Sequence, residues 1–306
     1  MTVIRPDDSW FAGLQDFPFA PRYWEWDGLR THYVDEGPRD GPVAMLIHGQ
    51  PTWSYLYRKM IPLLVNAGYR CVVPDHIGFG RSDKRTDDSW YTIARHVDRL
   101  EAFVEANDLR RITLFVQDWG GPIGLIGAMR HPDRYDRFAI LNTWLHTEEY
   151  EYSPAIRYWR ETACHPLWLS WTDGNLPCGA IVASAHIRHE ISETAAIRAA
   201  YEAPFGGDPA AKAGTRRFPA CIPFGDPVAG AADLQIDAHA ALRSVGKPVH
   251  FLFGDSDLIF PAASGEQWAS LVPGSTFDAI PRAGHFVQED APQECLDRFF
   301  ARRAAA

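Results

Sequence analysis

The segment Val116-Gln117-Asp118-Trp119-Gly120-Gly121 carries the strongest indication of the fold. An apolar run at residues 112–116 leads into it and predicts a short buried strand, and residues 120–130 predict a helix directly after it. A strand that turns straight into a helix around an Asp matches a nucleophile elbow, where small residues next to the nucleophile permit a tight, strained turn. Ser usually holds the central position, and Val116 is less small than the usual Gly. Taken alone, Asp118 fits equally well as the N-cap of the following helix.

Strand and helix patterns alternate around this turn. Strands are predicted at 43–47, 69–73 and 112–116, and helices at 53–66, 91–107 and 120–130. Strands that are apolar on both faces and alternate with helices predict a mostly parallel sheet with helices on both sides. The first half of the chain therefore predicts an α/β fold.

The alternation stops after residue 144. Residues 145–228 are rich in Trp, Tyr, Ala and Pro and carry no strand pattern, so they predict a mostly helical insertion, a cap or lid. Strand patterns return at 248–253 and 275–280, and a last helix is predicted over 292–302. We therefore expect a core formed by residues 1–144 and 229–306, with a helical cap at 145–228.

Length, charge and cysteine content exclude several classes of protein. The 306 residues suffice for one large domain with an insertion or for two modest domains, and the formal net charge of −9 argues against nucleic acid or an anionic membrane as the main partner. The sequence shows neither a secretory signal pattern nor an apolar stretch of the roughly 20 residues that span a bilayer. Five scattered cysteines without a Cys-x-x-Cys pair fit reduced thiols. We expect a cytoplasmic protein.

An Asp nucleophile has a chemical consequence. A carboxylate is ionised at neutral pH, so it needs no base to activate it. It suits attack on an sp³ carbon that carries a leaving group, which gives an alkyl ester that water later hydrolyses. A peptidase or lipase would more usually use Ser or Cys at Asp118.

The base and its partner acid are expected after the last two strands. Of the twelve histidines, His285 alone lies near the end of the last strand with a Gly before it, where this kind of fold places its base. The loop after the preceding strand offers two carboxylates, and Asp257 is favoured over Asp255 because it lies further into the loop. Less favoured acids, after an earlier strand, are Glu148 and Glu149. These candidates favour Asp118 as a nucleophile over Asp118 as a cap.

The loop His48-Gly49-Gln50-Pro51 follows another strand. We interpret it as a source of a backbone N–H for an oxyanion hole, from Gln50, paired with the N–H of Trp119. His48 is then structural, and the Gln50 side chain is expected to point into the site.

Together these segments resemble the haloalkane dehalogenases, members of the α/β-hydrolase superfamily. The resemblance covers nearly all of the chain apart from the cap, and four motifs in order make it specific. The matching segments are 48–58 (HGQPTWSYLYR), 75–83 (DHIGFGRSD), 116–121 (VQDWGG) and 283–289 (AGHFVQE).

The resemblance implies an α/β-hydrolase fold and a two-step mechanism. Asp118 displaces the halide in an SN2 step, and His285, oriented by Asp257, activates a water that hydrolyses the ester. Trp119 donates its indole N–H to the halide. The oxyanion lies on the N–H groups of Gln50 and Trp119. No metal or organic cofactor is implied, and the partners are a small apolar halogenated substrate and halide ion.

The family resemblance further suggests the subgroup that takes a second halide-binding Trp from the cap. That Trp is expected ahead of Leu176-Pro177, and of the two candidates Trp168 is favoured over Trp171, although neither spacing fits well. An indole N–H suits halide binding because it donates a hydrogen bond and cannot accept one.

The assembly is expected to be a monomer or a small homo-oligomer.

Two other functions compete with this one. An epoxide hydrolase of the same fold would share Asp, His and acid but needs cap tyrosines to protonate the opening alkoxide, and the candidates are Tyr150, Tyr152, Tyr158 and Tyr201. Against it, such enzymes usually carry His before the nucleophile, where this chain has Gln117. A non-catalytic protein that binds a small hydrophobic ligand is the other alternative, and it would typically lack a member of the triad.

Overall fold

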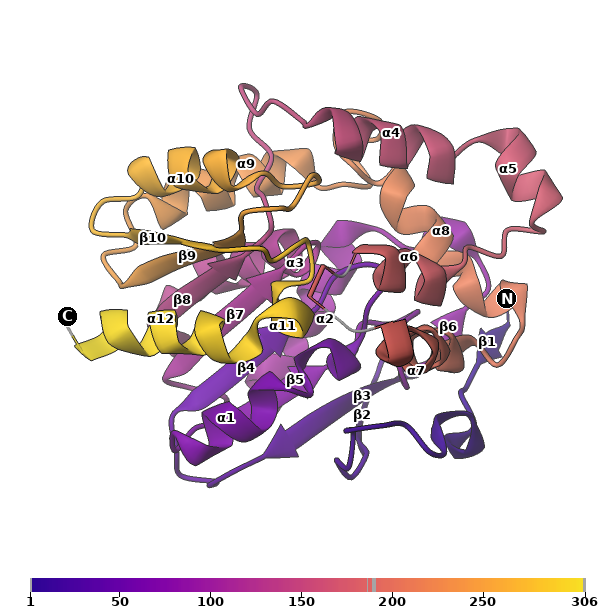
Figure 1. The fold of residues 1–306 in the computed structure, drawn as a ribbon, viewed down its shortest axis with the longest axis horizontal. Coiled ribbons are helices and arrows are strands. Elements are labelled where there is room, and N and C mark those ends of the chain that lie inside the picture. Colours follow the sequence, from indigo (N-terminus) through magenta and orange to yellow (C-terminus); the bar gives the residue numbers. More distant parts are fainter. Residues whose placement is uncertain (1, 186, 189–190, 305–306) are drawn as a thin grey trace.

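A computed structural model describes residues 2–185, 187–188 and 191–304 (Figure 1). Its centre is an eight-stranded sheet in the order β10-β9-β8-β7-β4-β5-β3-β2, and β1 and β6 form a separate small sheet. The strands from β10 to β5 run parallel, whereas β3 is antiparallel to β5 and to β2. The strands are β1 Val3–Ile4, β2 Arg22–Trp26, β3 Leu29–Glu36, β4 Val43–Ile47, β5 Arg70–Pro74, β6 Lys84–Arg85, β7 Ile112–Gln117, β8 Tyr135–Leu141, β9 Val249–Gly254 and β10 Thr276–Ile280.

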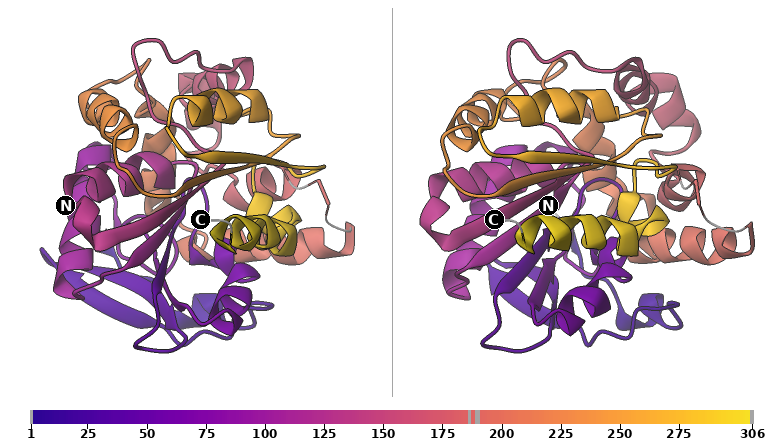
Figure 2. Two further views of the ribbon diagram at one scale, coloured as in Figure 1. Left: turned by 90° about the vertical axis from the view of Figure 1, so that its left-hand side faces the viewer. Right: turned by 60° about the vertical axis from the view of Figure 1, so that its left-hand side comes forward.

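Helices cover both faces of the sheet, as the apolar strands predicted (Figure 2). The helices α2 (Ile93–Ala106), α3 (Gly120–Arg130), α9 (Ala232–Leu242) and α10 (Ala262–Ser270) pack with one hydrophobic core. The helices α1 (Met60–Asn66), α11 (Val287–Asp290) and α12 (Pro292–Ala304) pack with the other. In β4 the side chains alternate between the two cores, and all five residues are buried. This pattern explains why the central strands are apolar throughout.

The predicted helix at 53–66 is wrong at its start. Trp53 is extended, with φ −156° and ψ −175°, and a 3₁₀ turn at Ser54–Tyr57 precedes the shorter α1. The N–H of Ser54 donates to the Asp75 carboxylate at 2.7 Å. The turn is therefore bound to the loop after β5 instead of continuing into a helix.

Between β8 and α9 the chain forms helices that lie over the carboxyl ends of the parallel strands (Figure 1). They are α4 Pro154–Ala163, α5 Pro166–Trp171, α6 Cys178–Ala185, α7 Ile191–Glu202 and α8 Ala213–Ala220. All of them fall within the range 145–228 predicted for the cap. The architecture is thus the α/β-hydrolase fold with a helical cap, as predicted.

Two further properties concern the chain as a whole. No helix in the described residues is long and apolar enough to span a membrane. The five cysteines are all free thiols.

Candidate active site

The turn between β7 and α3 holds Asp118 in a strained backbone conformation. Its φ of +50° lies in the left-handed region, which a non-glycine residue adopts only when its surroundings enforce it. The end of β8 supplies that enforcement, because the N–H of Asp118 donates to the Asn142 carbonyl at 3.1 Å and the Thr143 hydroxyl donates to the Asp118 carbonyl at 2.5 Å. At Gly120 a Cβ would overlap with the Ile47 carbonyl. These features are those of a nucleophile elbow.

The Asp118 carboxylate lies between two other loops at the same edge of the sheet. Its Oδ1 accepts a hydrogen bond from the backbone N–H of Gln50 at 2.8 Å, and its Oδ2 lies 3.5 Å from His285 Nε2. At Gly49 a Cβ would overlap with the Asp118 side chain, so only glycine leaves room for this approach. The predicted oxyanion donor from Gln50 therefore points at the carboxylate from which the oxyanion would form.

His285 is oriented by the acid favoured from sequence. Its Nδ1 lies 2.9 Å from Asp257 Oδ2, and both residues are buried. Asp257 Oδ1 accepts from the N–H of Ile259 at 2.7 Å. The fallback acid, Asp255, is exposed and accepts from the N–H of Arg282 at 2.8 Å, as a turn residue does.

Asn142, at the end of β8, is a polar residue that the sequence analysis missed. Its Nδ2 donates to Asp257 Oδ2 at 2.8 Å, and its Oδ1 accepts from the N–H of Gly254 at 2.9 Å. Asn142 thus holds Asp257 in place. It follows β8, the strand after which the less favoured acids Glu148 and Glu149 also come. Glu148 and Glu149 are exposed on the loop that follows. Only the position of a polar residue directly after a buried strand could have indicated Asn142.

The charges around His285 determine its protonation. Burial lowers the pKa of the imidazole, but the negative charge of Asp257 and the hydrogen bonds and charge that Asp118 and Asp257 offer outweigh it. The pKa of His285 is raised from 6.5 to about 10 as a result.

His48 has the structural role expected for it. It is fully buried, its Nδ1 lies 2.8 Å from the Gly49 carbonyl, and its Nε2 accepts from the N–H of His76 at 3.0 Å. Burial lowers the pKa of His48, which favours the neutral ring that this hydrogen bonding requires. Both ring nitrogens are therefore occupied in fixing the loop that carries Gln50.

An apolar cavity of about 220 Å³ lies between these loops and the cap. Asp118 and His285 line it together with Trp119, and the remaining lining residues are mostly aliphatic or aromatic. They are Gln50, Pro51, Trp144, Ile156, Trp159, Ile181, Ser184, Ala185, Ile222, Ile259 and Phe286. Such a cavity fits a small uncharged ligand with one reactive end beside the carboxylate.

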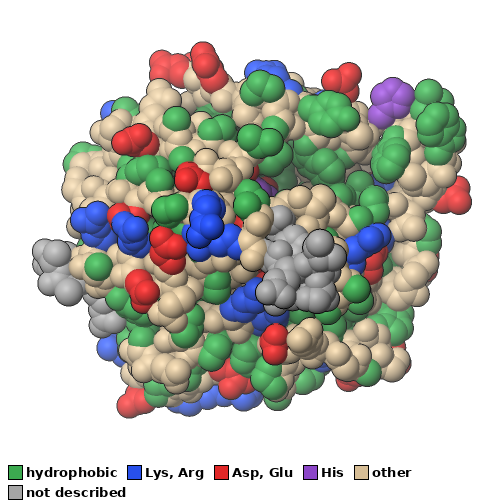
Figure 3. Space-filling view, in the orientation of Figure 1, with side chains coloured by type: hydrophobic (Ala, Val, Ile, Leu, Met, Phe, Trp, Pro, Cys, Tyr) green, Lys and Arg blue, Asp and Glu red, His purple; other side chains and the backbone are tan. Residues whose placement is uncertain are grey.

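The cap tryptophan at the cavity differs from the one expected. Trp159 lines the cavity, one helical turn after Ile156 on the same face of α4. Trp168 lies on α5, a helix without a fully buried residue, and does not line the cavity, while Trp171 is 79% exposed. The structure therefore places Trp159, and not the expected Trp168, at the lining of this cavity. The helices α4 and α5 lie at the upper right in Figure 1, and Figure 3 shows hydrophobic side chains gathered in that region.

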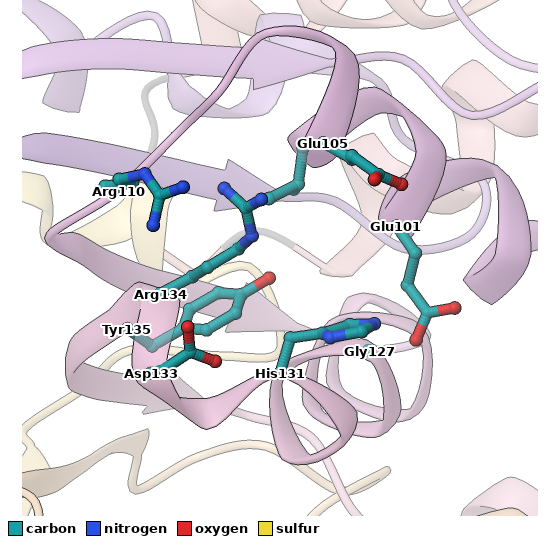
Figure 4. Close-up of a pocket in the computed structure, with 9 residues that line it drawn as sticks. Glu101, Glu105, Arg110, Gly127, His131, Asp133, Arg134 and Tyr135 are labelled. Carbon is teal, nitrogen blue, oxygen red and sulfur yellow. The ribbon is translucent and has the colours of Figure 1, made fainter.

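A second hollow, of about 240 Å³, has a different character (Figure 4). It lies at the opposite edge of the sheet, beside the start of β8 and the ends of α2 and α3. Its lining is largely charged, and it comprises Glu101, Val104, Glu105, Arg110, Gly127, His131, Asp133, Arg134 and Tyr135. Arg110 and Arg134 there both pair with Asp108. The apolar cavity, in contrast, is lined by Asp118 and by His285, which contacts Asp257.

Comparison with known proteins identifies the family. The family model of the alpha/beta hydrolase fold matches residues 42–163. Over its whole length the chain is 40% identical to a haloalkane dehalogenase of Mycolicibacterium paratuberculosis, of which it covers 99%. The chain belongs to the haloalkane dehalogenases. It is accordingly an enzyme, and these relatives support hydrolytic dehalogenation as its activity.

Two other similar proteins are a second haloalkane dehalogenase, compared by structure, and a decarboxylase, compared by sequence. The tetrameric haloalkane dehalogenase DpaA of Paraglaciecola agarilytica has a TM-score of 0.87 to this chain at 33% identity, and the match covers 97% of both chains. A cis-3-alkyl-4-alkyloxetan-2-one decarboxylase of Shewanella oneidensis is 32% identical over 91% of this chain and 86% of its own. The haloalkane dehalogenase of M. paratuberculosis is the more similar in sequence.

Proposed function

We propose that this enzyme hydrolyses the carbon–halogen bond of small apolar haloalkanes, with Asp118 as the nucleophile. The observation that carries the proposal is the position of the Asp118 carboxylate, which lines an apolar cavity and lies 3.5 Å from a buried His285. A carboxylate in such a place can attack an sp³ carbon without prior activation. His285 is then available for the second half of the reaction.

In the first step Asp118 Oδ2 forms a bond to the carbon that bears the halogen, and the halide leaves with the electron pair. Oδ1 is held by the Gln50 N–H, which leaves Oδ2 as the attacking atom. Trp119 and Trp159 both line the cavity, and their indole N–H groups are the donors assigned to the departing halide. Trp159 then supplies the cap donor that characterises the suggested subgroup.

In the second step His285 Nε2 takes a proton from water, and the hydroxide adds to the ester carbonyl carbon of Asp118. The carbonyl oxygen of that ester is Oδ1, so the N–H of Gln50 already faces the atom that becomes the oxyanion. The N–H of Trp119 completes the oxyanion hole. The alcohol leaves with a proton from His285, and Asp257 keeps the imidazole oriented throughout.

The rival reactions find less support at the cavity. None of the four candidate tyrosines for epoxide opening lines it: Tyr158 is 71% exposed, and the Tyr201 and Tyr152 hydroxyls bond to Glu289 and His146. A non-catalytic binding role leaves the triad geometry without a purpose.

The test is the release of free halide from a panel of short chloro-, bromo- and iodoalkanes. We expect release by the wild-type enzyme and none by Asp118→Ala. Asp255→Ala is the matched control, because it removes an exposed carboxylate from the loop that carries Asp257 and should remain active. His285→Gln should release one halide per enzyme and then retain the alkyl group, which intact-protein mass spectrometry detects. Epoxide opening without halide release would instead favour the epoxide hydrolase.

A further inference from the structure

Gln117, the last residue of β7, has a side-chain amide in contact with the proposed base. The residue is fully buried, and its Nε2 lies 3.1 Å from the His285 carbonyl oxygen and 3.2 Å from His285 Nε2. Its Oε1 is buried and has no hydrogen-bond partner among the described residues. The proposed mechanism gives this amide no role.

The two contacts determine which way the amide faces. A backbone carbonyl only accepts hydrogen bonds, so the NH₂ group and not Oε1 must face His285. The same NH₂ group then directs its second hydrogen toward His285 Nε2. Once alkylation has removed the Asp118 charge, a nitrogen that faces a donor is favoured as an acceptor, with the remaining proton on Nδ1, beside Asp257.

We propose that Gln117 is a positioning residue that holds His285 in its proton-accepting form for the hydrolysis of the alkyl ester. The inference rests on the proposed function, because it assumes that His285 deprotonates the water. An imidazolium would place its Nε2–H against the amide N–H, and the two donors repel. At 3.2 Å the contact with the neutral ring is long, so an incoming water can take over the Nε2 lone pair.

The orphan Oε1 supports this interpretation. Buried amide oxygens are almost always hydrogen-bonded, and an exception in a site asks for a reason. Turning the amide would direct Oε1 at the His285 carbonyl oxygen and lose the donor at Nε2. The contacts with His285 therefore orient the Gln117 amide, and its Oε1 is left without a hydrogen bond.

The effect of Gln117 on the pKa of His285 is opposite to that of two nearby carboxylates. The charged groups that face His285 are Asp257, from the loop after β9, and Asp118, from the elbow, and both raise the pKa of the imidazole. Alkylation turns Asp118 into a neutral ester, which removes one of these two charges. The amide of Gln117 does not change. Its lowering of the His285 pKa is therefore opposed by one carboxylate instead of two at the hydrolysis step, which needs the base.

The experiment measures the acidic limb of the pH dependence of kcat with a haloalkane that the wild-type enzyme hydrolyses. Gln117→Met removes the donor at similar size, and the midpoint should rise by roughly one pH unit, the value of one weak hydrogen bond. Gln117→Glu presents an acceptor to Nε2, so its midpoint should rise further and its alkyl-enzyme should accumulate. We therefore expect the midpoint of the acidic limb to be lowest with Gln at position 117, higher with Met and highest with Glu.

The matched control is Gln235→Met. Gln235 is also fully buried, and its amide bonds to the Gly230 carbonyl and the His146 N–H, without contact to the triad. This variant should lose stability and keep the wild-type midpoint. Should Gln117→Met fail to fold, Gln117→Glu still decides the matter because it keeps the shape of the side chain.

Midpoints that stay at the wild-type value while kcat falls would show a merely structural role and overturn the inference. Wild-type enzyme that releases no halide would refute the proposed function and the inference with it. An active wild-type enzyme with unmoved midpoints in both Gln117 variants refutes only the role of Gln117.

Discussion

Replacing Trp159 by Phe removes the indole N–H of a residue that lines the cavity and keeps an aromatic ring against the core. The Trp159 side chain is half-buried on α4 and lines the cavity, and its N–H makes no hydrogen bond within the described part of the chain. A hydrogen bond to a charged group is worth about 1.5–3 kcal/mol. Since 1.36 kcal/mol corresponds to a factor of ten, the loss should weaken bromide binding and slow the alkylation step by roughly ten- to 150-fold.

Trp168→Phe is the control for this change. Trp168 lies on α5, outside the cavity, so its indole N–H should contribute nothing to halide binding. Bromide affinity is measured by quenching of tryptophan fluorescence, and the alkylation rate by rapid-quench detection of the first halide released. Equal values for Trp159→Phe and wild type, or a loss confined to Trp168→Phe, would refute the assignment of the cap donor.

Two more predictions concern stability and substrate size. The raised pKa of His285, about 10, contributes stability that is complete below its unfolded pKa of about 6.5 and is lost as pH rises through 10. Urea unfolding at pH 6, 8 and 10 should therefore show a fall in wild-type stability that His285→Gln lacks. Trp144 lines the cavity and stacks on Phe260 at 4.8 Å. Trp144→Leu should shift the preferred haloalkane to a longer chain in the halide assay, at roughly 1–3 kcal/mol of stability, and an unchanged chain-length profile would contradict this.

The sequence predicted the sheet and its functional edge because both depend on short-range patterns. Apolar runs of five or six residues specify buried strands, and parallel strands place all their following loops at one edge. Asp118, His285 and Asp257 could therefore be expected to meet, and the structure brings them within 3.5 Å of one another in pairs. The antiparallel β2 and β3 were not predicted, although the Asp27-Gly28 turn between them, with both φ values positive, is a hairpin signal.

The cap was less predictable because its helices are placed by packing and not by strand order. Spacing from Leu176-Pro177 could not show that α5 contains no buried residue and that its Trp168 does not line the cavity. Trp159 had a signal that was overlooked, since it follows Ile156 by three residues on one helix face. Gln117 and Asn142 are polar residues in otherwise apolar strand ends, and only the atoms they contact reveal their importance.

In the proposed mechanism only the second half-reaction needs a neutral His285, and the groups around the imidazole suit that requirement. While Asp118 is a carboxylate, it and Asp257 keep the His285 pKa at about 10, so the ring is protonated at neutral pH. Formation of the alkyl ester removes the charge that lies 3.5 Å from Nε2. Burial and the Gln117 amide then favour the neutral ring, with its remaining proton directed to Asp257. In the proposed mechanism the loss of the Asp118 charge on alkylation therefore favours the neutral His285 that the hydrolysis step needs.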